Sequence, residues 1–177
     1  MDSVPFQFLT PNIPLVVVEA RARDRPAAVV VDTGAVGPYP LFLSEAVAAD
    51  LRLTLSAPVV PAQSTAIGPL RRSFRTAKLT SFSLGPIALQ DVQVSVTDVV
   101  DGLGAATGRT VQGIIGYDLL RRHRVRLDYA LKRISFDTPP PSGEPMPIQI
   151  GPKRPITLVS ARVNGRGPFT LELDTGA

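Results

Sequence analysis

The sequence predicts a mostly β protein with one or two short helices. The chain has 18 prolines among its 177 residues. β-branched runs repeatedly end at turn residues, and few segments are long or periodic enough for a helix. Apolar residues make up 44% of the chain, enough for a hydrophobic core. The length accommodates one ordinary domain, or one domain and a fragment.

The first predicted elements are a β-hairpin and a helix. Residues 13–23 are apolar and then alternate, which predicts a strand. Turn chemistry follows at residues 24–26, and residues 27–32 form the return strand, which runs into the sequence DTGA. Residues 44–51 begin with a capping serine followed by an early glutamate, so they predict a short helix.

The middle of the chain predicts further hairpins. Residues 62–80 contain two weak strands around a Gly-Pro tip, and residues 79–89 form two strand segments about a second Gly-Pro turn. Residues 92–96 alternate cleanly and predict a half-buried strand. Residues 98–109 hold three glycines and two aspartates, which predicts a flexible loop.

The remaining segments predict a strand with a helix, a hairpin and a linker. Residues 111–120 contain a short apolar strand, a glycine and then a short helix. Residues 125–128 and 134–137 form a closing hairpin. Residues 138–147 are Pro-rich and predict a stiff, extended linker.

The sequence after the linker repeats the pattern of residues 14–35 and ends in a second DTGA. Asp174 follows Asp32 by 142 positions, which indicates an internal duplication. We therefore expect a first lobe over residues 1–138, a linker over 139–150, and the opening hairpin of a second, truncated lobe over 151–177. In both copies an apolar strand delivers an aspartate to a turn that glycine permits.

Composition narrows the chemistry. Without cysteine, disulfides, thiolate zinc sites and a cysteine nucleophile are excluded. The single histidine, His123, excludes a multi-histidine metal site, and no nucleophile near it in sequence suggests a catalytic role. We expect no metal and no cofactor. The basic run RRHRVR, residues 121–126, is interpreted as a solvated surface, so we expect no nucleic-acid partner.

Three stretches, VVVDTGA, GIIGYDLL and LRRHRVRLDYALKRISF, together resemble the retropepsin-like aspartic proteases, and the resemblance covers residues 14–137. It implies a closed β-barrel lobe that works in pairs and hydrolyses peptide bonds. The substrate would be an extended peptide or protein segment held as an added strand under a flap. One position departs from the family pattern: Val36 follows the first DTGA, whereas the family often has Ser or Thr there.

The resemblance also implies the site residues. Catalytic carboxylates are expected at Asp32 and Asp174, in active-site turns completed by Thr33, Gly34, Thr175 and Gly176. Ile115 and Gly116 would support the first turn, and Ile67 and Gly68 would form the flap.

Pairing has a physical reason, because two carboxylates about 3 Å apart cannot both ionise and share one proton. The partner of Asp32 stays open at this point. It is either Asp174 of a completed second lobe or Asp32 of a second copy. If Asp174 is not the partner, the short second hairpin would either project without contacts or add strands to the first lobe. A catalytically inactive peptide-binding or assembly module is the alternative function.

No membrane partner is expected, since the sequence has no run of 18 apolar residues and no signal peptide pattern. We expect a soluble chain, and its compartment is not indicated; a periplasmic or secreted parent protein is compatible with the sequence.

Overall fold

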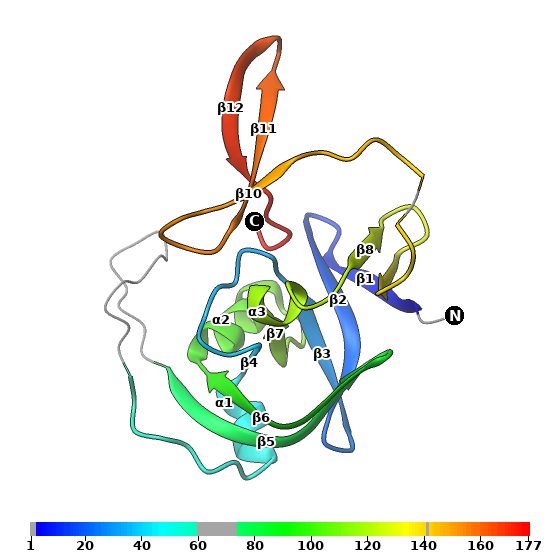
Figure 1. Ribbon diagram of the computed structural model, residues 1–177. Helices are drawn as coiled ribbons and strands as arrows, with labels where there is room; N and C mark the ends of the chain where they lie inside the picture. The colour runs from blue at the N-terminus through cyan, green and yellow to red at the C-terminus, as the bar shows by residue number, and fades with distance from the viewer. Residues whose placement is uncertain (1–2, 60–73, 141) are drawn as a thin grey trace.

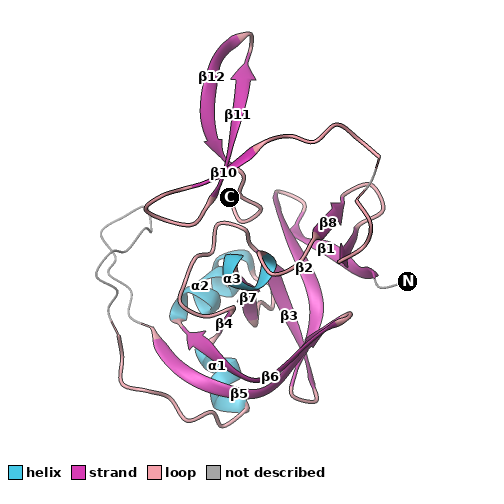
Figure 2. Ribbon diagram, in the orientation of Figure 1, coloured by secondary structure: helices cyan, strands magenta, loops and turns pink. Residues whose placement is uncertain are grey.

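The computed structural model describes residues 3–59, 74–140 and 142–177, so the predicted flap residues Ile67 and Gly68 lie outside the described residues. The described part contains twelve strands and three helices (Figures 1 and 2). In chain order these are β1 (Ser3–Thr10), β2 (Ile13–Ala22), β3 (Arg25–Val31), β4 (Leu41–Leu43), α1 (Glu45–Asp50), β5 (Arg75–Leu84), β6 (Ile87–Val96), α2 (Asp98–Thr107), β7 (Gly113–Ile115), α3 (Tyr117–Leu120), β8 (Val125–Asp128), β9 (Arg133–Phe136), β10 (Ile148–Ile150), β11 (Thr157–Val163) and β12 (Arg166–Glu172).

Six strands close into a barrel. The larger sheet has the order β3-β7-β4-β6-β5-β2-β1-β9-β8, and β3 also pairs with β2, which joins the two ends of the six-strand part. β2 and β3 form an antiparallel hairpin, whereas β3 and β7 run parallel with Val31 opposite Ile115. The closed ring leaves these strands without a free edge along the paired stretches. The predicted mostly β fold and its closed barrel are confirmed.

The barrel core comes from alternating apolar residues on its strands. Val16 and Val18 of β2 and Val29 and Val31 of β3 point into one cluster and are at most 1% exposed. Side chains two positions apart share a face of a strand, so these four positions face the interior together. Because β3 is buried to its last residue, its C-terminal end emerges from a rigid part of the molecule.

Two helices lie where the sequence predicts them. Ser44 caps α1 by accepting a hydrogen bond from the Val47 backbone N–H at 3.0 Å. α3 follows β7 directly after Gly116. The predicted strands at residues 79–89 and 92–96 are confirmed and extend further, as β5 and β6.

The prediction of a flexible loop at residues 98–109 is wrong, because this segment forms helix α2. Thr97 caps the helix, acidic residues occupy its first turn, and Gly108 ends it in the left-handed conformation with φ 62°. Val100 is fully buried against the barrel. Capping and burial of the apolar side outweigh the cost of about 1 kcal/mol for each internal glycine.

A strand that the sequence analysis did not predict, β1, extends the barrel sheet. It pairs with β2 on one side and with β9 on the other. The predicted closing hairpin is confirmed as β8 and β9. β1 thereby ties the N-terminal segment to the last strands of the first lobe.

The residues after the linker form a separate three-stranded sheet, β10-β11-β12. The last three residues of the predicted linker, Ile148–Ile150, belong to this sheet as β10. The β11–β12 hairpin extends away from the barrel, while the chain after β12 returns to the loop that follows β3 (Figure 1).

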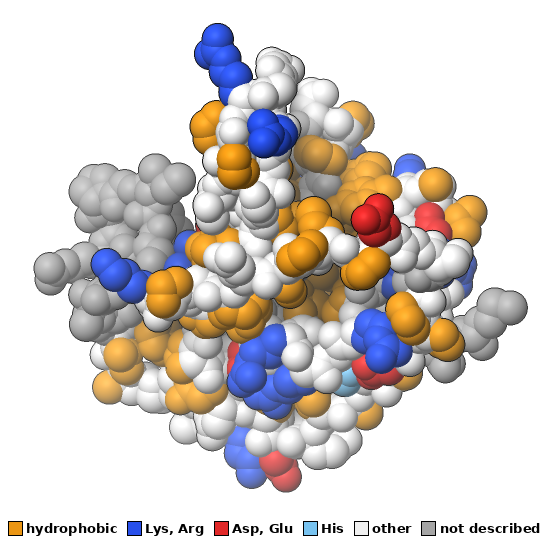
Figure 3. All heavy atoms as spheres, turned by 45° about the horizontal axis from the view of Figure 1, so that its top comes forward, with side chains coloured by type: hydrophobic (Ala, Val, Ile, Leu, Met, Phe, Trp, Pro, Cys, Tyr) orange, Lys and Arg blue, Asp and Glu red, His pale blue; other side chains and the backbone are white. Residues whose placement is uncertain are grey.

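One face of this small sheet is apolar and exposed. Five large apolar side chains of this sheet are 41–56% exposed, and hydrophobic side chains are visible on the projecting hairpin and around its base (Figure 3). They include Ile148, Ile150, Val163, Phe169 and Leu171. Within the described part of the chain, no helix has the length and apolar character needed to cross a membrane.

Candidate active site

The first DTGA turn begins where β3 leaves the barrel. The Asp32 backbone N–H donates to the Ile115 carbonyl at 3.1 Å, which anchors the turn to β7. Backbone N–H groups of Gly34 and Ala35 donate to Asp32 Oδ1 at 2.7 and 2.9 Å. The strand end and these two donors fix the direction of the carboxylate.

The second turn repeats this construction after β12. The Leu173 backbone N–H donates to the Thr157 carbonyl at 2.8 Å, which continues the hairpin up to the turn. The Gly176 N–H donates to Asp174 Oδ1 at 2.8 Å. Each aspartate thus accepts a hydrogen bond from the glycine two residues after it.

Reciprocal hydrogen bonds join the two turns. The Thr33 N–H donates to Thr175 Oγ1 and the Thr175 N–H donates to Thr33 Oγ1, each at 3.0 Å. The Thr33 hydroxyl donates to the Leu173 carbonyl at 2.9 Å, and the Thr175 hydroxyl donates to the Val31 carbonyl at 2.8 Å. Each acceptor carbonyl belongs to the residue before an aspartate, so the arrangement has approximate twofold symmetry.

Glycine is required in both turns because the backbones approach the opposite carboxylates closely. A Cβ placed on Gly34 would overlap the carboxylate of Asp174. A Cβ placed on Gly176 would overlap the carboxylate of Asp32. The two carboxyl groups therefore lie side by side, each against the glycine of the other turn.

This proximity changes the acid–base behaviour of the pair. Burial, and after it the negative charge of Asp174, raise the pKa of Asp32 to about 6. Hydrogen bonds from the Gly34 and Ala35 N–H groups act in the opposite direction because they stabilise the ionised form. A hydrogen bond between the two carboxyl groups also favours the protonated form of Asp32.

The supporting residues that were predicted from sequence lie behind the first turn. The Ile115 carbonyl accepts the Asp32 N–H, as described above. A Cβ on Gly116 would come within 2.5 Å of the Ala35 carbonyl oxygen, which itself accepts a hydrogen bond from the Tyr117 N–H at 2.8 Å. The structure therefore brings together eight of the ten predicted residues, and the two flap residues lie outside the described part.

Arg154 contacts the site but was missed by the sequence analysis. It lies in the loop between β10 and β11, and its Nη2 donates to the Gly34 carbonyl. The alignment of the two repeats places Arg154 opposite Ile13, because Pro155 corresponds to Pro14. The sequence feature that marks Arg154 is a difference between the repeats, an arginine where the first repeat has an isoleucine.

The other sequence features make their polar contacts with residues outside the two turns. His123 Nδ1 is 2.7 Å from Asp137 Oδ2, and this hydrogen bond holds the pKa of Asp137 below its usual range. In the basic run, Arg121 and Arg122 both form ion pairs with Asp118. Among the described residues, no group of three or more metal-ligating side chains is present.

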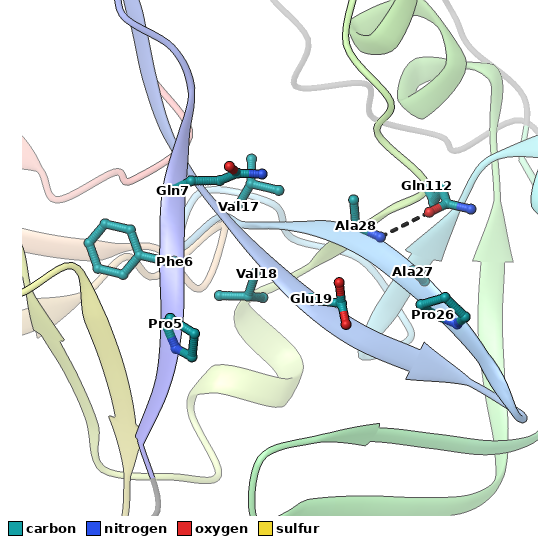
Figure 4. Close-up of a pocket in the computed structure, with 10 residues that line it drawn as sticks. All are labelled: Pro5, Phe6, Gln7, Val17, Val18, Glu19, Pro26, Ala27, Ala28 and Gln112. Atoms are coloured by element: carbon teal, nitrogen blue, oxygen red, sulfur yellow. Dashed lines mark hydrogen bonds between the residues drawn. The ribbon is translucent and has the colours of Figure 1, made fainter.

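A surface pocket of about 370 Å³ also lies outside the candidate site. It extends across β2 between β1 and β3 (Figure 4). The side chain of Gln112 at its edge accepts a hydrogen bond from the Ala28 N–H at 2.9 Å. None of its lining residues belongs to either DTGA turn.

Comparison with known proteins relates this geometry to one family. A family model described as aspartyl protease matches residues 18–119, which include the first turn and β7. One similar solved structure is a retropepsin-like aspartic protease from Rickettsia conorii, 16% identical, with TM-score 0.48 over 76% of this chain and 88% of that chain. Another is the retroviral protease-like domain of Ddi1 from Leishmania major, 17% identical, with TM-score 0.39 over 69% of this chain and 93% of that chain. No curated protein matches the chain.

Proposed function

The chain belongs to the aspartyl protease family, and we propose that it is an aspartic endopeptidase whose catalytic pair is Asp32 and Asp174. Family membership supports a protease-type function in general. The assignment of the two carboxylates, of the peptide substrate and of the completing partner is our proposal.

The observation that carries this proposal is the set of four hydrogen bonds between Thr33 and Thr175 and the strand ends. These bonds link two turns that are 142 positions apart in sequence. They hold the turns in a symmetric arrangement in which the carboxyl groups of Asp32 and Asp174 lie side by side. A structural turn has no need for a second, matched carboxylate, and placing two such groups together without a shared proton is unfavourable.

Such a pair can hydrolyse a peptide bond with water alone. In aspartic proteases generally, two carboxyl groups hold one proton between them. The ionised carboxylate takes a proton from a water molecule as the water oxygen attacks the peptide carbonyl carbon, and the protonated carboxyl group donates its proton to the carbonyl oxygen. The carboxyl group that took the water proton then gives it to the leaving nitrogen, and the other carboxylate takes a proton from a hydroxyl of the tetrahedral intermediate as the carbonyl re-forms and the C–N bond breaks. The catalytic pair returns to its initial state with one proton.

The raised pKa of Asp32 is consistent with this division of roles. A pair that must hold one proton loses activity when that proton dissociates. With a pKa of about 6 for Asp32, we expect activity to be high in mildly acidic solution and to decline as the pH rises above about 6.

The exposed apolar face of β10–β12 supports a second lobe as the completing partner. At the repeat offset of 142, Phe169 and Leu171 correspond to Ala27 and Val29 of β3. Those β3 residues are buried in the barrel core, whereas Phe169 and Leu171 are 45% and 41% exposed. Residues 151–177 would therefore open a second barrel joined to the first lobe (residues 1–138) by the linker, and further strands would cover this face.

A homodimer that pairs Asp32 with Asp32 of a second copy is the competing arrangement. It would require the second DTGA turn to leave its hydrogen bonds with Thr33. The Asp32–Asp174 pairing is preferred because those bonds satisfy the polar groups of both turns within one chain.

The proposal is tested with the natural protein and a denatured protein substrate between about pH 4 and pH 7. We expect cleavage by the wild type, strongest on the acidic side of this range, and none above background for Asp32→Asn. Asp91→Asn, a substitution at an exposed carboxylate that pairs with Lys78, serves as the matched control. Equal cleavage by the wild type and Asp32→Asn would contradict the assignment of Asp32 as a catalytic residue. Binding of a peptide by the wild type without cleavage would favour the inactive binding module.

A further inference from the structure

Arg154 connects the second repeat to the first active-site turn. The loop that carries it is closed by hydrogen bonds from the Gly151 N–H to the Ile156 carbonyl at 2.9 Å and from the Ile156 N–H to the Arg154 carbonyl at 2.7 Å. From this loop the side chain reaches the Gly34 carbonyl through Nη2, and Nη2 also lies 3.7 Å from Glu172 Oε1 on β12. Within the described part of the chain, its buried Nε has no hydrogen-bond partner, so the polar contacts concentrate at Nη2.

The contacted carbonyl shares a peptide unit with a donor to Asp32. The Gly34 C=O and the Ala35 N–H belong to one planar trans peptide and point in opposite directions. Arg154 contacts the oxygen side, and the Ala35 N–H on the other side donates to Asp32 Oδ1 at 2.9 Å. A contact that fixes the oxygen therefore fixes the direction in which the N–H points.

In the described part of the chain, no arginine contact of this kind supports the second turn. The position that corresponds to Arg154 in the first repeat is Ile13, an apolar residue that is 38% exposed and cannot donate a side-chain hydrogen bond. The two carboxylates therefore differ in their surroundings although the turns repeat each other.

We infer that Arg154 is a positioning residue that orients the Gly34–Ala35 peptide so that its N–H stabilises the ionised Asp32 carboxylate. The inference rests on the proposed function of Asp32. The contact comes from the second repeat, so the first carboxylate is set for its role when the two repeats are together. Among the described residues, the charged groups that contact this peptide or Asp32 are Asp174 and Arg154, and Glu172 lies beyond Arg154.

The test is an NMR titration of the Asp32 carboxyl carbon in the wild type, Arg154→Ala, Arg154→Lys and Arg162→Ala. Arg162 is an exposed arginine on β11 and provides the matched control. In Arg154→Ala we expect the midpoint of Asp32 to rise by about 0.5 to 1 pH unit, because the variant loses a positive charge and loosens the Ala35 donor. Arg154→Lys should recover part of this shift, and Arg162→Ala should titrate as the wild type does.

The direction of the shift distinguishes positioning from simple attachment of the hairpin. If Arg154→Ala only released the second repeat, Asp32 would lose burial and the charge of Asp174, and its midpoint would fall. A fall, or no shift, would overturn the inference.

The titration requires no turnover, so its outcome is separate from the outcome of the cleavage assay. In active protein, Arg154→Ala should also move the decline of kcat above about pH 6 to higher pH by about 0.5 to 1 unit with little change in KM, because the pair then keeps its proton to higher pH. A rise in KM at constant kcat would instead indicate lost substrate binding and would contradict a positioning role.

Discussion

Replacing Asp32 with asparagine should stabilise the protein at neutral pH although it removes the proposed catalytic group. The raised pKa means that the folded state binds a proton at Asp32 more tightly than the unfolded state does. As the pH rises from about 4 to about 6, the unfolded state loses this proton first, so the free energy of unfolding of the wild type decreases. Above pH 6 the folded protein holds an ionised, partly buried carboxylate beside Asp174.

The size of the effect follows from the pKa of Asp32. A rise from 3.8 to about 6 corresponds to about 3 kcal/mol at 1.36 kcal/mol per unit, which is an upper limit for a partly exposed group. An asparagine Oδ1 can still accept the Gly34 and Ala35 N–H groups, more weakly because it is neutral. We therefore expect Asp32→Asn to be about 2 kcal/mol more stable than the wild type at pH 7.5.

Urea unfolding of both proteins between pH 4 and pH 7.5 measures this difference. The gain should be largest at pH 7.5 and should shrink towards zero near pH 4, where Asp32 of the folded wild type is protonated. Glu144→Gln, a substitution of an exposed carboxylate in the linker, should show no such pH-dependent gain. Equal stability of Asp32→Asn and wild type at every pH would refute the paired, buried carboxylate.

Two further predictions concern the contact between the turns. Thr175→Val removes the acceptor of the Thr33 N–H and a hydroxyl donor to Val31, so the hydrogen exchange of the Thr33 amide should accelerate about thirtyfold for a loss of about 2 kcal/mol. Thr170→Val, at an exposed position of β12, should leave that rate unchanged, and equal rates in the two variants would contradict the observed pairing. Gly34→Ala places a Cβ against the Asp174 carboxylate, so it should separate the turns and return the Asp32 midpoint towards 3.8 in an NMR titration. An unchanged midpoint would show that the carboxylates are not in contact.

The duplicated motif explains why the two turns of the candidate site could be located from the sequence. An apolar strand that ends in DTGA predicts a buried strand followed by a turn at the barrel end. Two copies at a spacing of 142 predict two matching turns. The reciprocal hydrogen bonds between the backbone N–H groups and hydroxyl oxygens of Thr33 and Thr175 follow from that symmetry. Local pattern was also sufficient for α1, where Ser44 caps the helix.

The features that were missed depend on context or on asymmetry. Helix α2 contains glycines that predict a loop, and burial of Val100 together with the cap at Thr97 decides otherwise. β10 lies inside a Pro-rich stretch and forms because Ile150 and its neighbours pair with β11. Arg154 supports the first turn in the proposed scheme, and its counterpart in the first repeat is Ile13. A residue that is not repeated cannot be recognised from the similarity between the two repeats.

The partner of Asp32 is the central claim, and the peptidase activity of Asp174→Asn tests it most directly. If Asp32 and Asp174 form the pair, this variant of the natural protein should be as inactive as Asp32→Asn, while Asp91→Asn keeps wild-type activity. Full activity in Asp174→Asn, together with no activity in Asp32→Asn, would contradict the pairing and indicate a homodimer that joins two copies of Asp32.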